Sequence, residues 1–208
     1  MALYHLIRFF LAVAIAAIPF LLLRKTLQSK GLAIITVVVF FIVSIALSLF
    51  PAENVFMSFT TPEKAARYTG IGEVVCVAEG EESGLLITKQ RSGVQVQIYP
   101  KKDGEWQIGI GISFSQSSYA MEKGMITLYQ YRPTGEYYIS ANLFGADVPI
   151  QDSIGSVFHT YTQDEISAEH FSVYYAYVPQ FGDTYTVTID GTPIALTEDS
   201  PHLVKGLF

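Results

Sequence analysis

The amino-acid sequence predicts a membrane-anchored α+β protein, in which an N-terminal two-helix transmembrane hairpin precedes a mainly antiparallel, sandwich-like β domain with one short helix. Two long apolar runs occupy the first fifty residues, and short segments of alternating apolar and polar residues follow them. The charges are also segregated, because the first fifty residues hold four of the 13 basic residues, whereas all 19 acidic residues come later. We therefore divide the chain into a hairpin (1–50), a juxtamembrane connector (51–61) and a β-rich domain (62–208).

The two apolar runs, 4–23 and 32–50, each have close to the ~20 residues that an α-helix needs to cross a bilayer. The second run contains no ionisable residue, and the first carries His5 and Arg8 near one end, from which an arginine can reach the headgroups. Buried helices of a soluble protein would show a polar stripe, which is weak here. A cleavable signal peptide is the nearest alternative, but its small-residue cleavage motifs fall inside the first run rather than after it.

The segment between the two runs, 24–31, decides the predicted orientation. It carries Arg24, Lys25 and Lys30, against Arg8 alone at the opposite end of the first run. Short loops rich in Lys and Arg stay on the cytoplasmic side of a membrane. The loop is therefore predicted to be cytoplasmic, and both the N-terminus and residues 51–208 are predicted to be extracytoplasmic.

A short helix is predicted at the start of the β-rich domain. Thr61 is a typical N-cap, Pro62 suits the first helical position, and Gly70 ends the pattern, which indicates a helix over 62–69. Beyond it the apolar period changes to two, with turn residues between the segments and the hairpin signal Asp190-Gly191 near the end. We expect about nine strands, over 72–79, 83–90, 94–99, 105–116, 125–132, 136–144, 156–162, 171–178 and the hairpin 184–196.

Two short motifs carry a family resemblance. The sequence FTTPEKA, from Phe59 to Ala65, opens the predicted helix, and DGEW, from Asp103 to Trp106, forms a turn followed by a strand. With the preceding anchor, this pattern resembles membrane-anchored extracytoplasmic β-domain proteins of Gram-positive bacteria. The resemblance implies a cell-envelope setting and no particular activity.

One face of the strand predicted at 105–116 is nearly bare of side chains. Apolar residues alternate along it from Trp106 to Phe114, and the opposite face would carry Gln107, Gly109, Gly111, Ser113 and Ser115. Repeated glycine in a strand often marks the close approach of another backbone or of a ligand. The sequence leaves two interpretations: a packed neighbouring element, which we favour, or a partner surface formed by these five residues.

The strands are also rich in tyrosine, which suits a half-buried sheet surface. In adjacent pairs such as Tyr137-Tyr138 and Tyr174-Tyr175, alternation predicts that one ring of each pair is exposed. Exposed tyrosine rings can bind glycan or protein. The single cysteine, Cys76, is expected to be a buried apolar group, because no second cysteine exists for an internal disulfide.

Motifs for catalysis and cofactor binding are missing from the sequence. His159, Asp164, Glu165, Glu169 and His170 are metal-ligand types, but their spacing matches no known module. No G-x-S-x-G, phosphate loop or dinucleotide fingerprint occurs, and the acidic domain disfavours nucleic acid. We expect no metal, no cofactor and no catalytic residue.

These observations favour a non-enzymatic binding or sensory module held at the outer face of the cell membrane by two spans. The alternative is an accessory subunit that docks on a larger membrane complex through its apolar hairpin, and an envelope enzyme is a third, less favoured reading. The expected partners are the lipid bilayer and either another membrane protein or a component of the cell envelope.

Overall fold

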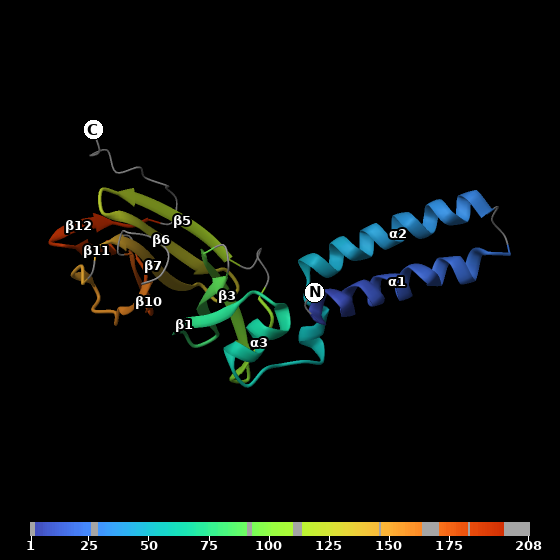
Figure 1. Cartoon of the computed structure of the whole chain (residues 1–208), viewed down its shortest axis with the longest axis horizontal. Coiled ribbons are helices and arrows are strands. Elements are labelled where there is room, and N and C mark those ends of the chain that lie inside the picture. The colour runs from blue at the N-terminus through green and yellow to red at the C-terminus, as the bar shows by residue number, and fades with distance from the viewer. Residues whose placement is uncertain are drawn as a thin grey trace.

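The computed structural model of the chain describes residues 3–25, 29–90, 93–109, 114–145, 147–163, 171–182 and 184–197. Two helices, α1 (Leu3–Leu23) and α2 (Ser29–Leu49), lie side by side as an antiparallel hairpin (Figure 1). Phe9 of α1 and Phe40 of α2 pack edge to face with ring centroids 6.2 Å apart. The start of α1 and the end of α2 lie at the same end of the hairpin, which is also the end that carries the β-rich domain (Figure 1).

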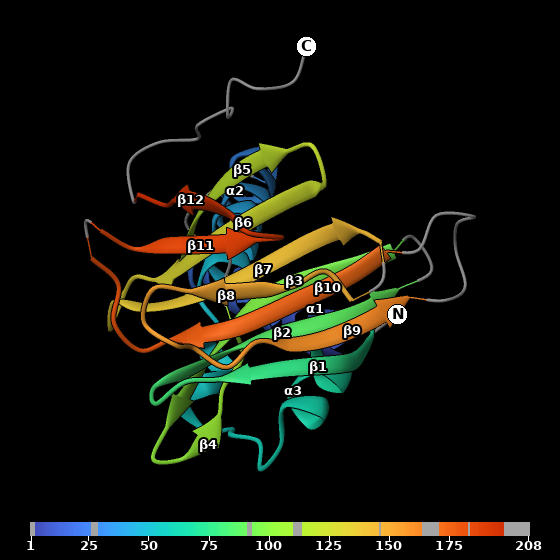
Figure 2. The same cartoon turned by 90° about the vertical axis from the view of Figure 1, so that its left-hand side faces the viewer.

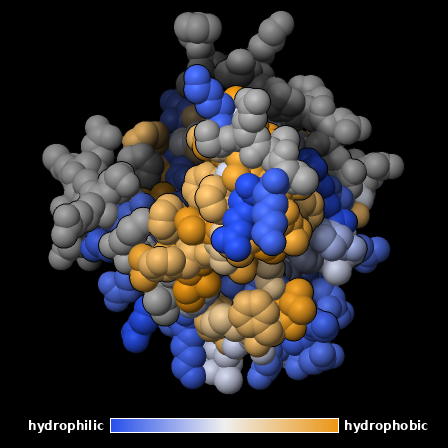
Figure 3. Space-filling view, turned by 90° about the vertical axis from the view of Figure 1, so that its right-hand side faces the viewer, coloured by the Kyte–Doolittle hydropathy of each residue, from blue (hydrophilic) through white to orange (hydrophobic). Residues whose placement is uncertain are grey.

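Both hairpin helices are long and apolar enough to cross a membrane. Only 17% of the apolar window in α1 and 11% of that in α2 are buried inside the molecule. Seen from the far end of the hairpin, their surface is a broad apolar area with the hydrophilic surface of the β-rich domain around it (Figure 3). These helices therefore do not have the burial of core helices in a soluble protein.

Two short helices connect the hairpin to the sheets. The 3₁₀-helix η1 (Ala52–Val55) follows α2, and α3 (Pro62–Thr69) opens the β-rich domain with the predicted bounds. Thr61 caps α3 by accepting a hydrogen bond from the backbone N–H of Lys64. Gly70 ends the helix in the left-handed conformation (φ 72°), and its N–H donates to the carbonyl of Ala66.

Twelve strands are formed among the described residues, and they make three antiparallel sheets. The first sheet has the order β1-β2-β3-β4, the central sheet β5-β6-β7-β10-β9 and the third sheet β12-β11-β8. The strand bounds are β1 (Glu73–Glu79), β2 (Ser83–Gln90), β3 (Gly93–Lys102), β4 (Glu105–Trp106), β5 (Phe114–Met121), β6 (Gly124–Tyr131), β7 (Glu136–Phe144), β8 (Ile150–Asp152), β9 (His159–Gln163), β10 (Phe171–Val178), β11 (Thr186–Ile189) and β12 (Thr192–Ala195).

The central sheet lies between the first and third sheets (Figure 2), with an apolar core on each of its faces. One face packs on the first sheet through side chains such as Leu85 and Tyr138, and the other packs on the third sheet through side chains such as Ile139 and Val187. The outer face of the first sheet is covered by α3, with Ala65, Ala66 and Trp106 in that core. The domain is thus a stack of three sheets and one helix.

This stacking overturns one expectation from the sequence. One ring of each adjacent tyrosine pair was expected to be exposed, yet Tyr137, Tyr138, Tyr174 and Tyr175 are all buried. The expectation assumed a two-layer sandwich, in which every strand has one solvent face. At these positions the central sheet has none, because Tyr137 and Tyr174 enter the core shared with the third sheet while Tyr138 and Tyr175 enter the core shared with the first.

The prediction of one continuous strand over 105–116 was also wrong. Strand β4 contains only Glu105 and Trp106, residues 107–109 are not in a strand, and β5 begins at Phe114 in a different sheet. Strand β8 (Ile150–Asp152) lies in a stretch where the sequence did not predict a strand. The remaining predicted strands are present, with ends that differ by a few residues.

We predict that residues 56–208 fold without the hairpin. Among the described side chains, the two largest cores contain only residues beyond position 70, and the third includes a single hairpin residue, Tyr4. A domain of ~150 residues buries about 70% of its unfolded-chain surface, which is enough for autonomous stability. The purified fragment should melt in one cooperative transition by circular dichroism, and a broad, non-cooperative melt would contradict this independence.

Candidate functional site

The bare strand face predicted from the sequence is not a continuous surface in the structure. Gly109 packs closely against the first sheet, because a side chain placed on it would overlap the carbonyl oxygen of Ile98 on β3. Gly111 and Ser113 lie outside the described residues. At Gly109 the packed interpretation of the glycine therefore holds.

The two described polar members of that face lie in different surroundings. The side-chain amide of Gln107 donates to the backbone carbonyl of Asn54 in η1 at 3.3 Å. The hydroxyl of Ser115, on β5, donates to Gln130 at 3.2 Å within the central sheet. Gln107 thus contributes to the connection with the hairpin, and a partner surface that joins both residues stays a prediction.

A buried ion pair forms the main polar contact between the hairpin and the β-rich domain. Nε and Nη2 of Arg8, on α1, donate to the two carboxylate oxygens of Glu53, in η1, at 2.9 and 3.0 Å. Both residues are buried. The sequence suggested that Arg8 can reach the headgroups, which stays a prediction; in the structure its guanidinium contacts a carboxylate that lies 45 residues further along the chain.

Aromatic rings surround the pair. The guanidinium of Arg8 lies 4.0 Å from the ring centre of Tyr4, a cation–π contact. Tyr4 packs edge to face on Tyr68 of α3, which in turn contacts Phe59. Burial raises the pKa of Glu53, but the hydrogen bonds from Arg8, a backbone hydrogen bond and the positive charge of Arg8 together outweigh this and hold the pKa below its ordinary value. The carboxylate is therefore charged at neutral pH.

Asn54, the next residue in η1, connects the ion pair to the segment that follows β4 of the first sheet. Its side-chain oxygen accepts from the backbone N–H of Ile108 at 2.9 Å, and its side-chain nitrogen donates to the carbonyl of Ile108 at 3.0 Å. Phe59 also exchanges two backbone hydrogen bonds with Trp106 of β4. We call Arg8, Glu53, Asn54 and Tyr68 the joint, since these residues connect α1, η1, α3 and the first sheet.

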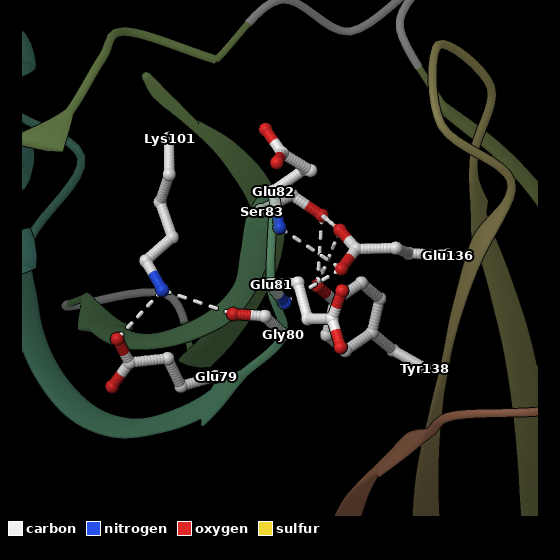
Figure 4. Close-up of polar contacts among 8 residues, drawn as sticks. All are labelled: Glu79, Gly80, Glu81, Glu82, Ser83, Lys101, Glu136 and Tyr138. Carbon is white, nitrogen blue, oxygen red and sulfur yellow. Dashed lines mark hydrogen bonds and ion pairs between the residues drawn. The ribbon is translucent and has the colours of Figure 1, made fainter. Parts of the chain in front are cut away.

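A second polar cluster connects the first sheet to the central sheet (Figure 4). Glu136, at the start of β7, points into the turn between β1 and β2, where one carboxylate oxygen accepts from the backbone N–H groups of Glu81 and Glu82 at 2.7 and 3.0 Å. Its other oxygen accepts from the hydroxyl of Ser83, which also bonds the Tyr138 hydroxyl at 2.7 Å. Burial raises the pKa of Tyr138, so this phenol stays protonated.

The residue that opens the turn, Gly80, has no space for a side chain. An added Cβ would overlap the Tyr138 hydroxyl, the Glu136 carboxylate and the ring of Tyr177. On the other side of the turn, Lys101 of β3 donates to the Gly80 carbonyl at 2.9 Å and pairs with Glu79 at 2.7 Å (Figure 4). Each group is satisfied by its neighbours, which is typical of a structural lock rather than a reactive centre.

Next to this lock lies a surface groove of about 340 Å³. It runs between the end of β1, the start of β9 and the end of β10, and the connection that precedes β9 forms part of its wall. Its lining is mixed, with a histidine and a tyrosine ring among small and apolar residues. The lining residues are Ala78, Glu79, Gly155, Ser156, Val157, His159, Tyr177 and Pro179.

The hairpin carries a second groove, of about 320 Å³, between α1 and α2. Small side chains from α1, Ala16 and Ala17, form part of its floor, and Phe20 and Phe40 are among the rings that border it. Its lining is almost wholly apolar. Lipid chains or another apolar helix fit such a surface.

No group of three or more His, Cys, Asp or Glu side chains within the described ranges is arranged to hold a metal ion. His159 lies in the mixed groove, whereas Asp164, Glu165, Glu169 and His170 fall outside the part of the chain that the structure describes. Cys76 is buried, as expected, and burial raises the pKa of its thiol. A thiol of this kind is a poor nucleophile.

Comparison with known proteins gives no relative. No family model, no curated protein and no solved structure matches the chain.

Sequence reasoning did not find the joint, the lock or the mixed groove. Arg8 and Glu53 are 45 residues apart and Glu82 and Glu136 are 54 apart, so no local pattern connects them. A usable signal did exist for the joint: Arg8 is the one basic residue in the first apolar run, and Glu53 is the first acidic residue after the second. Charges at membrane depth usually have a partner.

We predict that Gly109→Val destabilises the protein by about 3 kcal/mol, because overpacking against a backbone carbonyl cannot be relieved by a side-chain rotation. Gly182→Val is the matched control, since no atom outside its chain neighbours lies within 4 Å of the position of an added Cβ. The midpoint of urea unfolding should fall for the first variant and hold for the second. Equal midpoints in both variants would show that the close approach at Ile98 is absent.

Proposed function

We propose that this protein is an integral membrane protein that presents an acidic, non-enzymatic binding or sensory domain on the outer face of the cell membrane. The hairpin crosses the membrane twice, with the loop 24–31 inside the cell and residues 51–208 outside. The joint holds the domain in one orientation on the hairpin. The observation that carries the proposal is the buried ion pair between Arg8 and Glu53.

The exposed apolar surface supports membrane insertion. A water-soluble protein rarely exposes contiguous apolar surface on this scale, and large side chains are exposed along both helices, including Phe10, Leu22 and Phe41. The exposed apolar surface continues past the end of α2, where Val55 and Phe56 are 88% and 70% exposed. Apolar side chains at this level fit the boundary between headgroups and acyl chains.

The ion pair supports the two-span topology. Arg8 lies near the start of the first span and Glu53 directly follows the second, so their contact requires both chain ends to be on the same side of the membrane. An even number of spans satisfies this requirement. The positive charge of the loop at the opposite end then favours the loop as the cytoplasmic element.

The acidic character of the domain and the structural use of its best-paired carboxylates support binding over catalysis. The strongly paired acidic groups, Glu53 and Glu136, are occupied by structural partners. The mixed groove, in contrast, is open and has the size of a small ligand site. A binding or sensory role uses such a surface without further chemistry.

A second function, that of an accessory subunit in a larger membrane complex, is favoured by the apolar groove on the hairpin. Its small floor residues, Ala16 and Ala17, would allow a partner helix to approach closely. Ala17→Leu would fill this groove. Loss of a co-purifying membrane partner in this variant, with the β-rich domain intact, would favour the accessory role over the first proposal.

We predict that the two charges of the joint depend on each other. Glu53→Leu or Arg8→Met alone should destabilise the folded protein by about 3–5 kcal/mol, because each leaves a buried charge without a partner. The double variant should recover most of this loss, since replacing both charges leaves none unpaired. Urea unfolding of the full chain in detergent micelles measures all three, and additive losses in the double variant would contradict direct pairing.

The same pair predicts a pH dependence. The pKa of Glu53 is lower in the folded protein than in the unfolded chain, so its contribution to stability is present at neutral pH and is lost as the pH falls below the ordinary carboxyl range, about 4. Glu53→Gln removes the titrating group. The difference in unfolding free energy between wild type and this variant should shrink as the pH is lowered, and a constant difference would contradict the assignment.

The topology is tested by cysteine labelling in intact cells with a membrane-impermeant reagent. Thr134→Cys, in an exposed turn of the β-rich domain, should be labelled, whereas Lys25→Cys, in the loop, should react only after the membrane is opened. The native Cys76 is buried, so labelling of the wild-type protein measures the background. Labelling of Lys25→Cys but not of Thr134→Cys in intact cells would reverse the proposed orientation.

A further inference from the structure

The mixed groove lies at the open edge of two packed sheets. Strand β1 is the edge of the first sheet, and β9 is the edge of the central sheet. The groove is lined by the last residues of β1, by the first residue of β9 and by the end of β10. A ligand in the groove would therefore contact strand edges as well as side chains.

The outward-facing backbone groups of β1 follow from its pairing with β2. The N–H of Gly80 donates to the carbonyl of Ser83, so this pair is hydrogen-bonded, and hydrogen-bonded pairs alternate along an antiparallel ladder. Ala78, opposite Leu85, is consequently hydrogen-bonded to β2, whereas Val77 and Glu79 direct their N–H and C=O groups away from it. This edge offers donors and acceptors at the spacing of an extended chain.

The side chains in the groove suit a peptide with alternating residues. Val157 and Pro179 provide apolar surface on one wall, and the ring of Tyr177 provides a flat surface near the acidic turn. The ring of His159 stacks on Tyr175 with centroids 5.4 Å apart, which holds the imidazole at the side of the groove. An apolar side chain of a bound strand would find a complementary surface here.

The end of the groove next to Gly80 is electronegative. Tyr177 contacts the position of Gly80, and besides burial, the carboxylates of Glu136 and Glu81 raise the pKa of this phenol. Lys101, the basic group bonded to this turn, pairs with Glu79 on the outer face of the first sheet. Glu81 and Glu82 are exposed and their carboxylates have no ion pair among the described residues. A basic side chain is therefore the complementary group at this end.

We propose that the mixed groove binds an extended peptide segment that carries a basic side chain, and that the peptide adds as a strand to the free edge of β1. The backbone of the peptide pairs with Val77 and Glu79, its apolar side chains lie on Val157 and Pro179, and its basic side chain lies beside Glu81. This inference names the partner class of the proposed binding domain and rests on that function.

Three fluorescent heptapeptides test this inference on the full chain in nanodiscs. The first alternates valine with lysine, the second has glutamate in place of each lysine, and the third has proline in place of each valine, which removes backbone donors. The first should bind saturably in fluorescence anisotropy, and the other two should bind at least about tenfold more weakly, as strand addition and charge complementarity require. Empty nanodiscs measure binding to lipid.

Two variants locate the bound peptide. Val77→Pro removes the outward N–H but none of the hydrogen bonds to β2, and should weaken peptide binding about tenfold. The control, Val77→Thr, keeps the N–H and should change the peptide affinity less than about twofold. Val157→Arg places a cation at an exposed position in the groove and should weaken the binding of the lysine peptide in particular. Because Val77→Pro could also disturb the edge strand itself, Val157→Arg serves as the independent test of the binding site, provided that its melting temperature equals that of the wild type.

The inference is overturned if the lysine peptide does not bind, if the lysine and glutamate peptides bind equally, or if neither Val77→Pro nor Val157→Arg weakens binding. These outcomes are separate from a failure of the proposed function. A chain that labels with the predicted topology but binds no peptide would overturn only the groove assignment. Reversed labelling with intact peptide binding would overturn only the membrane orientation.

Discussion

Burying a guanidinium and a carboxylate together is favourable only when the two groups meet in good geometry, and this requirement at Arg8 and Glu53 constrains the whole molecule. The pair is bidentate, enclosed by Tyr4 and Tyr68, and joined through Asn54 to Ile108, just beyond β4 of the first sheet. A rotation of the domain about the end of α2 would separate the two charges. The connector is therefore a rigid joint rather than a flexible linker.

The rigid arrangement continues through the sheets. The joint holds the segment that follows β4 at Ile108, the lock at Glu136 fixes the turn between β1 and β2 to the central sheet, and the third sheet closes the far side of the core. Each contact joins segments that are distant in the sequence. The mixed groove is built where the first and central sheets meet, so a peptide bound there would act on an element connected to the hairpin. The proposed sensory role would use this continuity.

The elements with local signals could be predicted from the sequence, and the sites could not. The two apolar helices, the bounds of α3 and the Asp190-Gly191 hairpin each follow from residues close together in the chain. The three-sheet stack was missed because a strand buried on both faces, such as β7, carries tyrosines in adjacent positions that a two-layer interpretation assigns to opposite environments. The joint and the lock were missed because contacts between residues so far apart in the sequence depend on the completed fold. Gly109 was partly predictable: a missing side chain indicates that another group lies close, but it does not identify that group as the carbonyl of Ile98.

Rotational-echo double-resonance NMR would detect the direct ion pair that holds the hairpin and the domain together. The full chain in lipid bilayers would carry ¹⁵N in the arginine side chains and ¹³C in the side-chain carboxyl groups of glutamate, with Arg8→Met as the blank. The account predicts strong dephasing that is absent from the blank, because the Arg8 nitrogens lie 2.9 and 3.0 Å from the Glu53 oxygens. Dephasing equal to that of the blank would show that the two groups are apart in the membrane, and would contradict the account.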